Sequence, residues 1–208
     1  MNAISFIFVI SLKHIVVFQA DCLQDFHIIQ NYFNEKSIKS ASVFGCFGKT
    51  EQIVLAKMLM LQTRSISVLS INGQKAHKIL NNNHHHIGVI LDGDCPQSSN
   101  FLILCGQLKF FDVKHHWLIT TTSLNFMKKF ENVVLNIDAD IQVAVQNSTT
   151  LSWTIVDIYN PASKHGGALN YTKLGFYNRK QGYIVRNNEA KYWSRKNMTG
   201  ITFKSMIV

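Results

Sequence analysis

Short apolar runs alternate with helical patterns along most of this 208-residue chain, and this alternation limits the folds open to it. The expected strands are Ser40–Cys46, Ser65–Ile71, Ile87–Leu91, Trp117–Thr120 and Val133–Ile137. The expected helices are Cys22–Phe33, Glu51–Thr63, Gln74–Leu80, Asn100–Phe111 and Ser123–Phe130. Strands that alternate with helices form parallel sheets whose two faces are covered by the helices. We therefore predict an α/β fold with a single doubly wound, mainly parallel sheet, similar to a flavodoxin or to one lobe of a periplasmic binding protein.

The helix expected over Glu51–Thr63 is so apolar that most of its circumference should be buried.

The pattern changes near the middle of the chain. After Asp140, by contrast, Ile141–Val145 and Leu151–Tyr159 are typical of strands with no helix between them. We interpret residues 21–145 as an α/β lobe and residues 146–193 as a β-rich extension.

The first twenty residues contain a short apolar run interrupted by Lys13. The run is too short to cross a bilayer, and cleavage after Ala20 would suit a secretory signal peptide. We interpret residues 1–20 as a signal peptide, which places the rest of the chain in the secretory pathway. A buried first strand is the alternative.

Cysteines and glycosylation sequons agree with an oxidising compartment. Cys22, Cys46, Cys95 and Cys105 are an even number without the Cys-x-x-Cys spacing of zinc sites. Sequons begin at Asn147, Asn170 and Asn197, and each is a candidate acceptor for an N-linked glycan.

The expected sheet suggests one disulfide pairing. The first and third strands of a doubly wound sheet are commonly neighbours, and Cys46 and Cys95 follow the carboxyl ends of these strands. Cys22 and Cys105 would then pair or stay free. A bridge between Cys95 and Cys105 is the main competing arrangement.

The net charge of +9 raises the question of a nucleic-acid partner. The basic residues are scattered, and their densest cluster, residues 179–196, lies outside any expected recognition helix. We therefore expect a solvated basic surface and no nucleic-acid partner.

One motif suggests an enzyme, the segment Gly45-Cys-Phe-Gly-Lys-Thr50 between a strand and a helix. A phosphate-binding loop of the type Gly-x-x-x-x-Gly-Lys-Thr needs a first glycine where this chain has Val43, so its ring of amides would be incomplete. An intracellular P-loop-like or flavodoxin-like enzyme that binds phosphate at Gly45–Thr50 is the alternative function. Asp92 and Asp138 could imitate magnesium ligands, but such aspartates are common at strand ends.

Histidines occur in two groups, His84–His86 and His115-His116. Neighbouring histidines on an extended chain point to opposite faces, and no carboxylate or cysteine follows at a ligand spacing. We therefore predict no metal, cofactor or catalytic residue, and no enzymatic activity.

The C-terminal residues 194–208 combine a basic segment, Ser194–Asn197, with an amphipathic strand pattern over Ile201–Val208. A strand without a partner cannot pair its backbone groups. We interpret this stretch as a hinge and the first strand of a domain that the chain does not contain. Deletion of Gly200–Val208 is expected to leave the stability of the lobe unchanged.

Several segments, in their order and spacing, resemble the extracellular N-terminal region of insect ionotropic receptors, the divergent relatives of ionotropic glutamate receptors. They are Val43–Cys46, Gly88–Cys95, His116–Ile119, Asn136–Ala144, Val156–Asn160 and Arg195–Gly200. The acid-sensing olfactory branch is the most similar, although Phe47 stands where that branch has tryptophan.

This resemblance implies an extracellular domain of a ligand-gated cation channel that detects volatile acids or amines. A ligand-binding domain with a membrane pore would follow Val208, so no binding residue can be carried over to this chain. The region would serve assembly or trafficking, with co-receptor subunits of the same family as partners on the extracellular side of the plasma membrane. A single lobe has no closing cleft, so we expect no tight small-molecule ligand. A secreted odorant-binding decoy is a further alternative.

Overall fold

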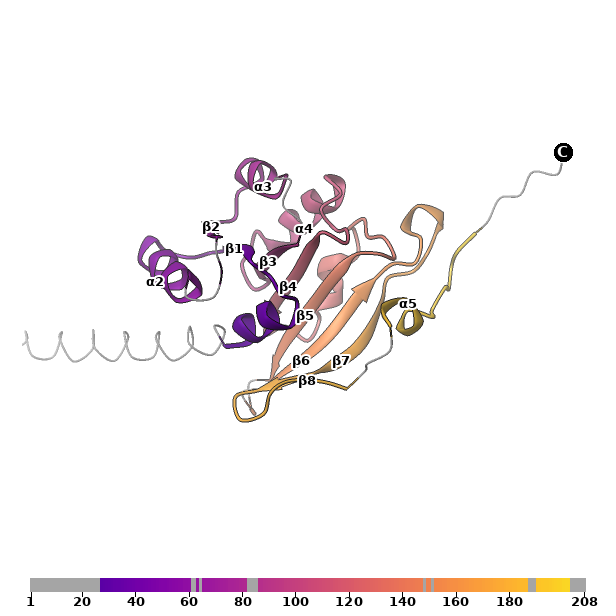
Figure 1. The fold of residues 1–208 in the computed structure, drawn as a ribbon. Coiled ribbons are helices and arrows are strands. Elements are labelled where there is room, and N and C mark those ends of the chain that lie inside the picture. The colour runs from indigo at the N-terminus through magenta and orange to yellow at the C-terminus, as the bar shows by residue number, and fades with distance from the viewer. Residues whose placement is uncertain are drawn as a thin grey trace, which may run out of the picture.

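A computed structural model describes residues 27–60, 63, 65–81, 86–147, 149–150, 152–186 and 190–202. Within these ranges, eight strands form one sheet in the order β2-β1-β3-β4-β5-β6-β7-β8 (Figure 1). Their bounds are β1 Ser40–Gly45, β2 Ser65–Ser70, β3 Ile87–Asp92, β4 His115–Thr121, β5 Asp140–Asn147, β6 Ser152–Tyr159, β7 Asn170–Asn178 and β8 Gly182–Val185. Neighbours from β2 to β5 are parallel, and neighbours from β5 to β8 are antiparallel.

Helices cover both faces of this sheet. They are residues 27–35, α2 Lys49–Met60, α3 Gly73–Leu80, α4 Ser98–Gln107 and α5 Lys191–Ser194, with short 3₁₀ turns at η1 Phe126–Phe130 and η2 Ser163–His165. Successive strand residues point to opposite faces, so Val43 packs in one core with the helix 27–35 and α2, whereas Phe44 packs in the other with α3 and α4. The predicted doubly wound, mainly parallel α/β fold is therefore confirmed.

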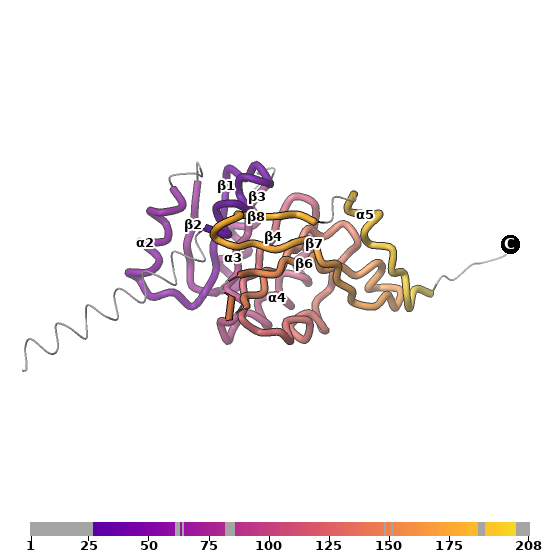
Figure 2. The backbone as a smooth tube through the Cα atoms, turned by 90° about the horizontal axis from the view of Figure 1, so that it is seen from below, coloured from indigo at the N-terminus to yellow at the C-terminus, as the bar shows by residue number. Residues whose placement is uncertain are grey.

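The predicted β-rich extension continues the same sheet. Trp153 and Ile155 of β6 and Tyr177 of β7 pack in the core that contains the helix 27–35. In both views of the chain, α2 and α5 lie toward opposite ends of the molecule (Figure 2). None of the helices in the described ranges is both long enough and apolar enough to span a membrane.

The strand predicted over Val133–Ile137 is wrong. These residues form a loop in which Val133 and Leu135 are buried, because their apolar side chains pack into the core beside η1 and α4. The place beside β4 is taken by β5 instead, with Ile141 paired to Trp117. Asp138 therefore does not end a strand.

Helix α2 is also less buried than predicted. It packs beside the edge strand β2, and only Leu55 and Leu59 are buried. Ile53 is 56% exposed and Met60 is 60% exposed, which leaves an apolar face of α2 uncovered. An edge helix has sheet on one side only, and this explains the failed prediction.

Candidate functional site

The carboxyl end of the parallel strands is the usual ligand-binding end of a doubly wound sheet, at the point where the strand order reverses. Here that point lies between β1 and β3. A disulfide joins Cys46, directly after β1, to Cys95, shortly after β3, with a Cα–Cα distance of 5.5 Å. The bridge that the sequence favours therefore ties together the two loops that would border a ligand.

The loop Gly45–Thr50 does not form a phosphate cradle. Lys49 and Thr50 already belong to α2, and the amide of Gly48 donates a hydrogen bond to Glu51 Oε2 at 2.6 Å. A carboxylate thus occupies the helix N-terminus that a phosphate would need, and its charge would repel the phosphate. The geometry gives the P-loop alternative no support.

The aspartates at this end fasten loops. Asp94 accepts hydrogen bonds from the Thr121 hydroxyl at 2.5 Å and from the amide and hydroxyl of Thr122 at 2.8 and 2.9 Å. Burial alone would raise the pKa of Asp94, but these bonds lower it. Asp92 accepts the amide of Asp94 at 3.0 Å. Both carboxylates therefore hold the loops that follow β3 and β4.

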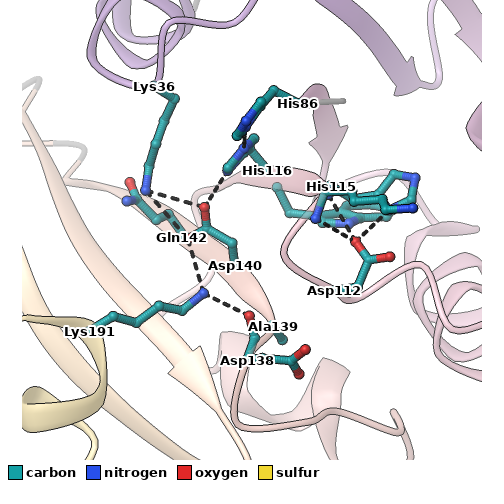
Figure 3. Close-up of polar contacts among 12 residues, drawn as sticks. Lys36, His86, Asp112, His115, His116, Asp138, Ala139, Asp140, Gln142 and Lys191 are labelled. Atoms are coloured by element: carbon teal, nitrogen blue, oxygen red, sulfur yellow. Dashed lines mark hydrogen bonds and ion pairs between the residues drawn. The ribbon is translucent and has the colours of Figure 1, made fainter. Parts of the chain in front are cut away.

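The opposite, amino end of the parallel strands carries a cluster of charged side chains around Asp140 (Figure 3). His116 of β4 is paired in register with Asp140 of β5, and its Nδ1 donates to the Asp140 carboxylate. Lys36, just beyond the helix 27–35, lies 3.3 Å from the same carboxylate, and Lys191 of α5 lies 3.8 Å from it. One buried anion thus connects three distant parts of the chain.

These neighbours determine the ionisation of Asp140. Burial by itself would raise its pKa, but the hydrogen bond from His116 and the charges of Lys36 and Lys191 lower the pKa well below the usual value. Lys191 also donates to the carbonyl oxygen of Asp138 at 2.8 Å. The carboxylate is therefore ionised at neutral pH and holds α5 against the sheet.

The histidines of β4 point in different directions, as expected for neighbouring residues on a strand. The ring of His116 stacks on that of His86, with 2.9 Å between the ring nitrogens. The ring of His115 instead lies against Asp112 Oδ1 at 2.8 Å and the carbonyl oxygen of Leu80 at 3.0 Å. Over the described residues, no group of three or more His, Cys, Asp or Glu side chains is arranged to hold a metal. His84 and His85 lie outside those residues.

A small polar pocket of about 210 Å³ opens beside the cluster. Its polar lining comprises Glu35, Lys36, Asp140, Gln142, Asp157, Tyr183, Lys191 and Ser194. The Tyr183 hydroxyl donates to Gln142 Oε1 at 2.6 Å, and burial raises the pKa of Tyr183. Two of its three carboxylates already have cationic partners, Asp140 with Lys36 and Lys191 and Asp157 with Arg195, so the pocket does not call for a charged ligand.

Arg195 attaches the C-terminal segment, residues 190–202, to the sheet through a buried ion pair. Its guanidinium binds both carboxylate oxygens of Asp157 in β6, from Nε at 2.7 Å and from Nη2 at 2.6 Å. It also donates to the carbonyl oxygens of Ile137 and Ala139. The side chain is 0% exposed. The expectation of a solvated basic segment is therefore wrong at Arg195, because Asp157 is a buried carboxylate that needs a cation.

The residues after Arg195 lie against the turn that precedes β7. The amide of Ala168 donates to the carbonyl oxygen of Thr199 at 3.1 Å, and the amide of Thr202 donates to the carbonyl oxygen of His165 at 2.9 Å. Gly166 and Gly200 meet here with φ of +80° and +86°, and a Cβ on Gly200 would lie 2.4 Å from the carbonyl oxygen of Gly166. Ile201 and Thr202, where the predicted strand begins, are not in a strand, and the rest of Ile201–Val208 lies outside the described residues.

The remaining predicted site residues are dispersed. Cys105 is a buried free thiol in α4, and burial raises its pKa to about 12. Because Cys95 is joined to Cys46, the competing Cys95–Cys105 bridge is wrong. Cys22 and the expected signal peptide, residues 1–20, lie outside the described residues. Asn147 and Asn197 are exposed, and Asn170 is half-buried at the start of β7.

Sequence reasoning missed the Asp140 cluster and the Arg195–Asp157 pair. One signal was available, since Asp157 is an acidic residue inside the apolar strand 152–159 and so predicts a buried cationic partner. Nothing in the local sequence pointed to Arg195, which is 38 residues away.

Comparison with known proteins places this structure in a family. The sequence model described as "Ionotropic receptor 75a N-terminal" matches residues 23–208. Ionotropic receptor 75a of Drosophila sechellia is 23% identical over 184 residues, which cover 78% of this chain and 29% of that protein. Ionotropic receptor 75a of Drosophila melanogaster is 22% identical over 131 residues, or 57% of this chain and 21% of that protein. The chain thus spans less than a third of the length of these relatives, and it belongs to the family of ionotropic receptor 75a N-terminal domains.

Proposed function

We propose that this chain is the extracellular N-terminal domain of a subunit of a chemosensory, ligand-gated cation channel, and that it acts in subunit assembly and trafficking. Family membership supports the receptor context, and the Cys46–Cys95 disulfide suits an oxidising, extracellular location. In this function the domain performs no chemistry. It presents surfaces to co-receptor subunits of the same family.

The uncovered face of α2 carries this proposal. Ile53, Val54 and Met60 are 56%, 39% and 60% exposed, beside the edge strand β2. An apolar helix face next to a sheet edge is costly to leave in water and is typical of protein–protein interfaces. We assign this α2 face, defined by Ile53, Val54 and Met60, to contact with a second receptor subunit.

The test is a paired substitution in the full chain, Ile53→Ser with Met60→Ser, produced together with tagged co-receptor subunits in insect cells. The variant should keep the wild-type melting temperature, because both side chains are exposed, and should lose co-purification with the partner. Leu124→Ser is the matched control, since Leu124 is 82% exposed but lies far from α2 in the sequence. Unchanged co-purification of the paired variant would contradict the α2 assignment.

The closed carboxyl end of the sheet supports an assembly role over odorant binding. The disulfide and the Gly48–Glu51 contact occupy the place where a doubly wound sheet binds small ligands. Calorimetry of the full chain with short-chain carboxylic acids and amines should detect no binding. Micromolar affinity for any of them would contradict this part of the proposal.

A further inference from the structure

Two of the three glycosylation sequons share the same local turn. At Asn147, the side-chain Oδ1 accepts hydrogen bonds from the amide of Thr149 at 3.0 Å and from its hydroxyl at 2.6 Å. At Asn197, Oδ1 accepts the amide of Thr199 at 3.0 Å and its hydroxyl at 2.5 Å. Both asparagines are exposed. In both, the sequon threonine binds Oδ1 of the side-chain amide whose Nδ2 would receive the sugar.

The third sequon is arranged differently. Asn170 is half-buried at the start of β7, where it pairs with Tyr159 of β6. Its Nδ2 donates to the carbonyl oxygen of Ala168 at 2.9 Å. The sequon hydroxyl of Thr172 donates to the carbonyl oxygen of Ser194 at 3.3 Å, away from Asn170. The hydroxyl that an acceptor sequon needs therefore contacts α5 instead.

Asn170 and Asn197 also touch each other. Nδ2 of Asn197 donates to Oδ1 of Asn170 at 2.8 Å. This bond uses one of the two hydrogens on Nδ2 of Asn197, and the exposed side chain keeps the other for a sugar. Asn170 is instead half-buried, its Nδ2 donates to Ala168, and the segment beside it is fixed at Arg195 and again at Thr199. The folded domain thus gives a glycan more room at Asn197 than at Asn170.

Exposed apolar side chains give the Asn197 glycan a second role. Met198, directly after Asn197, is 50% exposed, and Tyr171, directly after Asn170, is 56% exposed. A bulky, solubilising sugar attached at Asn197 would shield them from association with other molecules.

We propose that the folded domain carries N-linked glycans at Asn147 and Asn197 and none at Asn170. The donor is a lipid-pyrophosphate-linked oligosaccharide of the secretory pathway. The bond between sugar C1 and the pyrophosphate oxygen breaks, a bond between C1 and the asparagine Nδ2 forms, Nδ2 loses one proton to a base of the transferase, and the lipid pyrophosphate leaves. This inference rests on the extracellular location in the proposed function.

Glycopeptide mass spectrometry of the full chain produced in insect cells tests the inference. The wild type should carry two glycans, Thr149→Ala and Thr199→Ala should each lose one, and Thr172→Ala should keep both. A glycan on Asn170, or an empty Asn147 or Asn197, would overturn the assignment.

A designed sequon distinguishes failure of the glycan assignment from failure of the proposed function. Lys180→Thr places a threonine in the exposed turn between β7 and β8, two residues after Asn178, the half-buried last residue of β7. There Oδ1 of Asn178 already accepts the amides of Lys180 at 3.1 Å and Gln181 at 2.7 Å. This variant should gain a third glycan. If it does and Asn147 or Asn197 stays empty, the inference alone is wrong. If every site including Asn178 stays empty, the extracellular location is wrong and the inference falls with it.

Discussion

The two ends of the parallel strands are built in opposite ways. At the carboxyl end, a covalent bond between Cys46 and Cys95 and the hydrogen bonds of Asp94 close the loops on themselves. At the amino end, Asp140 and Asp157 use ionic contacts to hold segments that are distant in the sequence. The first end joins neighbouring loops, whereas the second attaches the C-terminal segment to the sheet.

This difference shows that a doubly wound sheet can bind a segment of its own chain at the end opposite its usual ligand-binding end. The loops at the carboxyl end are tied to one another, and the amino end fixes the path of residues 190–202 along the sheet. Residues 190–202 are therefore a docked part of the domain, in contrast to the hinge that the sequence suggested.

Arg195→Met should have the largest effect. It leaves the buried Asp157 carboxylate without its cation, and breaking a buried ion pair in this way costs about 3–5 kcal/mol. Urea unfolding followed by circular dichroism measures the change. Arg179→Met, at an exposed arginine in the turn after β7, is the matched control and should stay within about 0.5 kcal/mol of wild type. A loss at Arg195 no larger than that of the control would mean that the segment is not held by this pair.

Cys46→Ala with Cys95→Ala tests the carboxyl end. The bridge closes a loop with a sequence separation of 49, and loss of such a disulfide lowers the free energy of unfolding by about 2–4 kcal/mol. Thermal unfolding with and without reductant measures this loss, and reductant should have no further effect on the variant. Hydrogen exchange of residues 191–202 under native conditions should remain as in wild type, because these residues contact the other end of the sheet. Faster exchange there would show that the two ends are coupled.

Asp140→Asn tests the charge cluster and its dependence on pH. Loss of hydrogen bonds to a charged group costs about 1.5–3 kcal/mol each. Since the folded state lowers the pKa of Asp140, its contribution is fully present above the unfolded-state pKa of about 3.9 and is lost as the pH falls toward the lower folded-state value. The difference between wild type and variant should thus be largest near neutral pH and shrink below about pH 4. Asp138→Asn is the control, because it keeps the backbone carbonyl that accepts from Lys191, and it should lose less stability than Asp140→Asn at neutral pH.

Deletion of Gly200–Val208 should have the smallest effect. It removes the hydrogen bond from the Thr202 amide to the carbonyl of His165, worth about 0.5–1.5 kcal/mol, and keeps Arg195. Thermal unfolding provides the comparison with a longer deletion, residues 195–208, which should cost as much as Arg195→Met. Equal losses for the two deletions would place the anchor after Thr199 instead of at Arg195.

The fold was largely predictable because its signal is local. The alternation of strands and helices indicated the doubly wound sheet, and the positions of Cys46 and Cys95 favoured their bridge. The failures occurred where tertiary packing overrides local pattern. Val133 and Leu135 alternate like a strand but lie in a loop and pack into the core, and Ile53 and Met60 look like core residues but lie on the exposed side of α2.

The candidate site was not predictable for the same reason. The charge on Asp140 is balanced by Lys36 and Lys191, which are 104 and 51 residues away in the sequence and are brought together only by the order of the strands. The apolar strand around Asp157 signals a buried carboxylate, but Arg195 looked like one of many surface cations, and only the fold places it beside Asp157.

A double-mutant cycle on Arg195 and Asp157 tests whether their buried ion pair holds the C-terminal segment on the sheet. The free energy of unfolding would be measured for the wild type, Arg195→Met, Asp157→Leu and the double variant. If the buried pair holds the C-terminal segment on the sheet, the double variant should be more stable than the sum of the single losses implies, with a coupling of at least about 2 kcal/mol. Additive losses, with a coupling within about 0.5 kcal/mol of zero, would contradict the account.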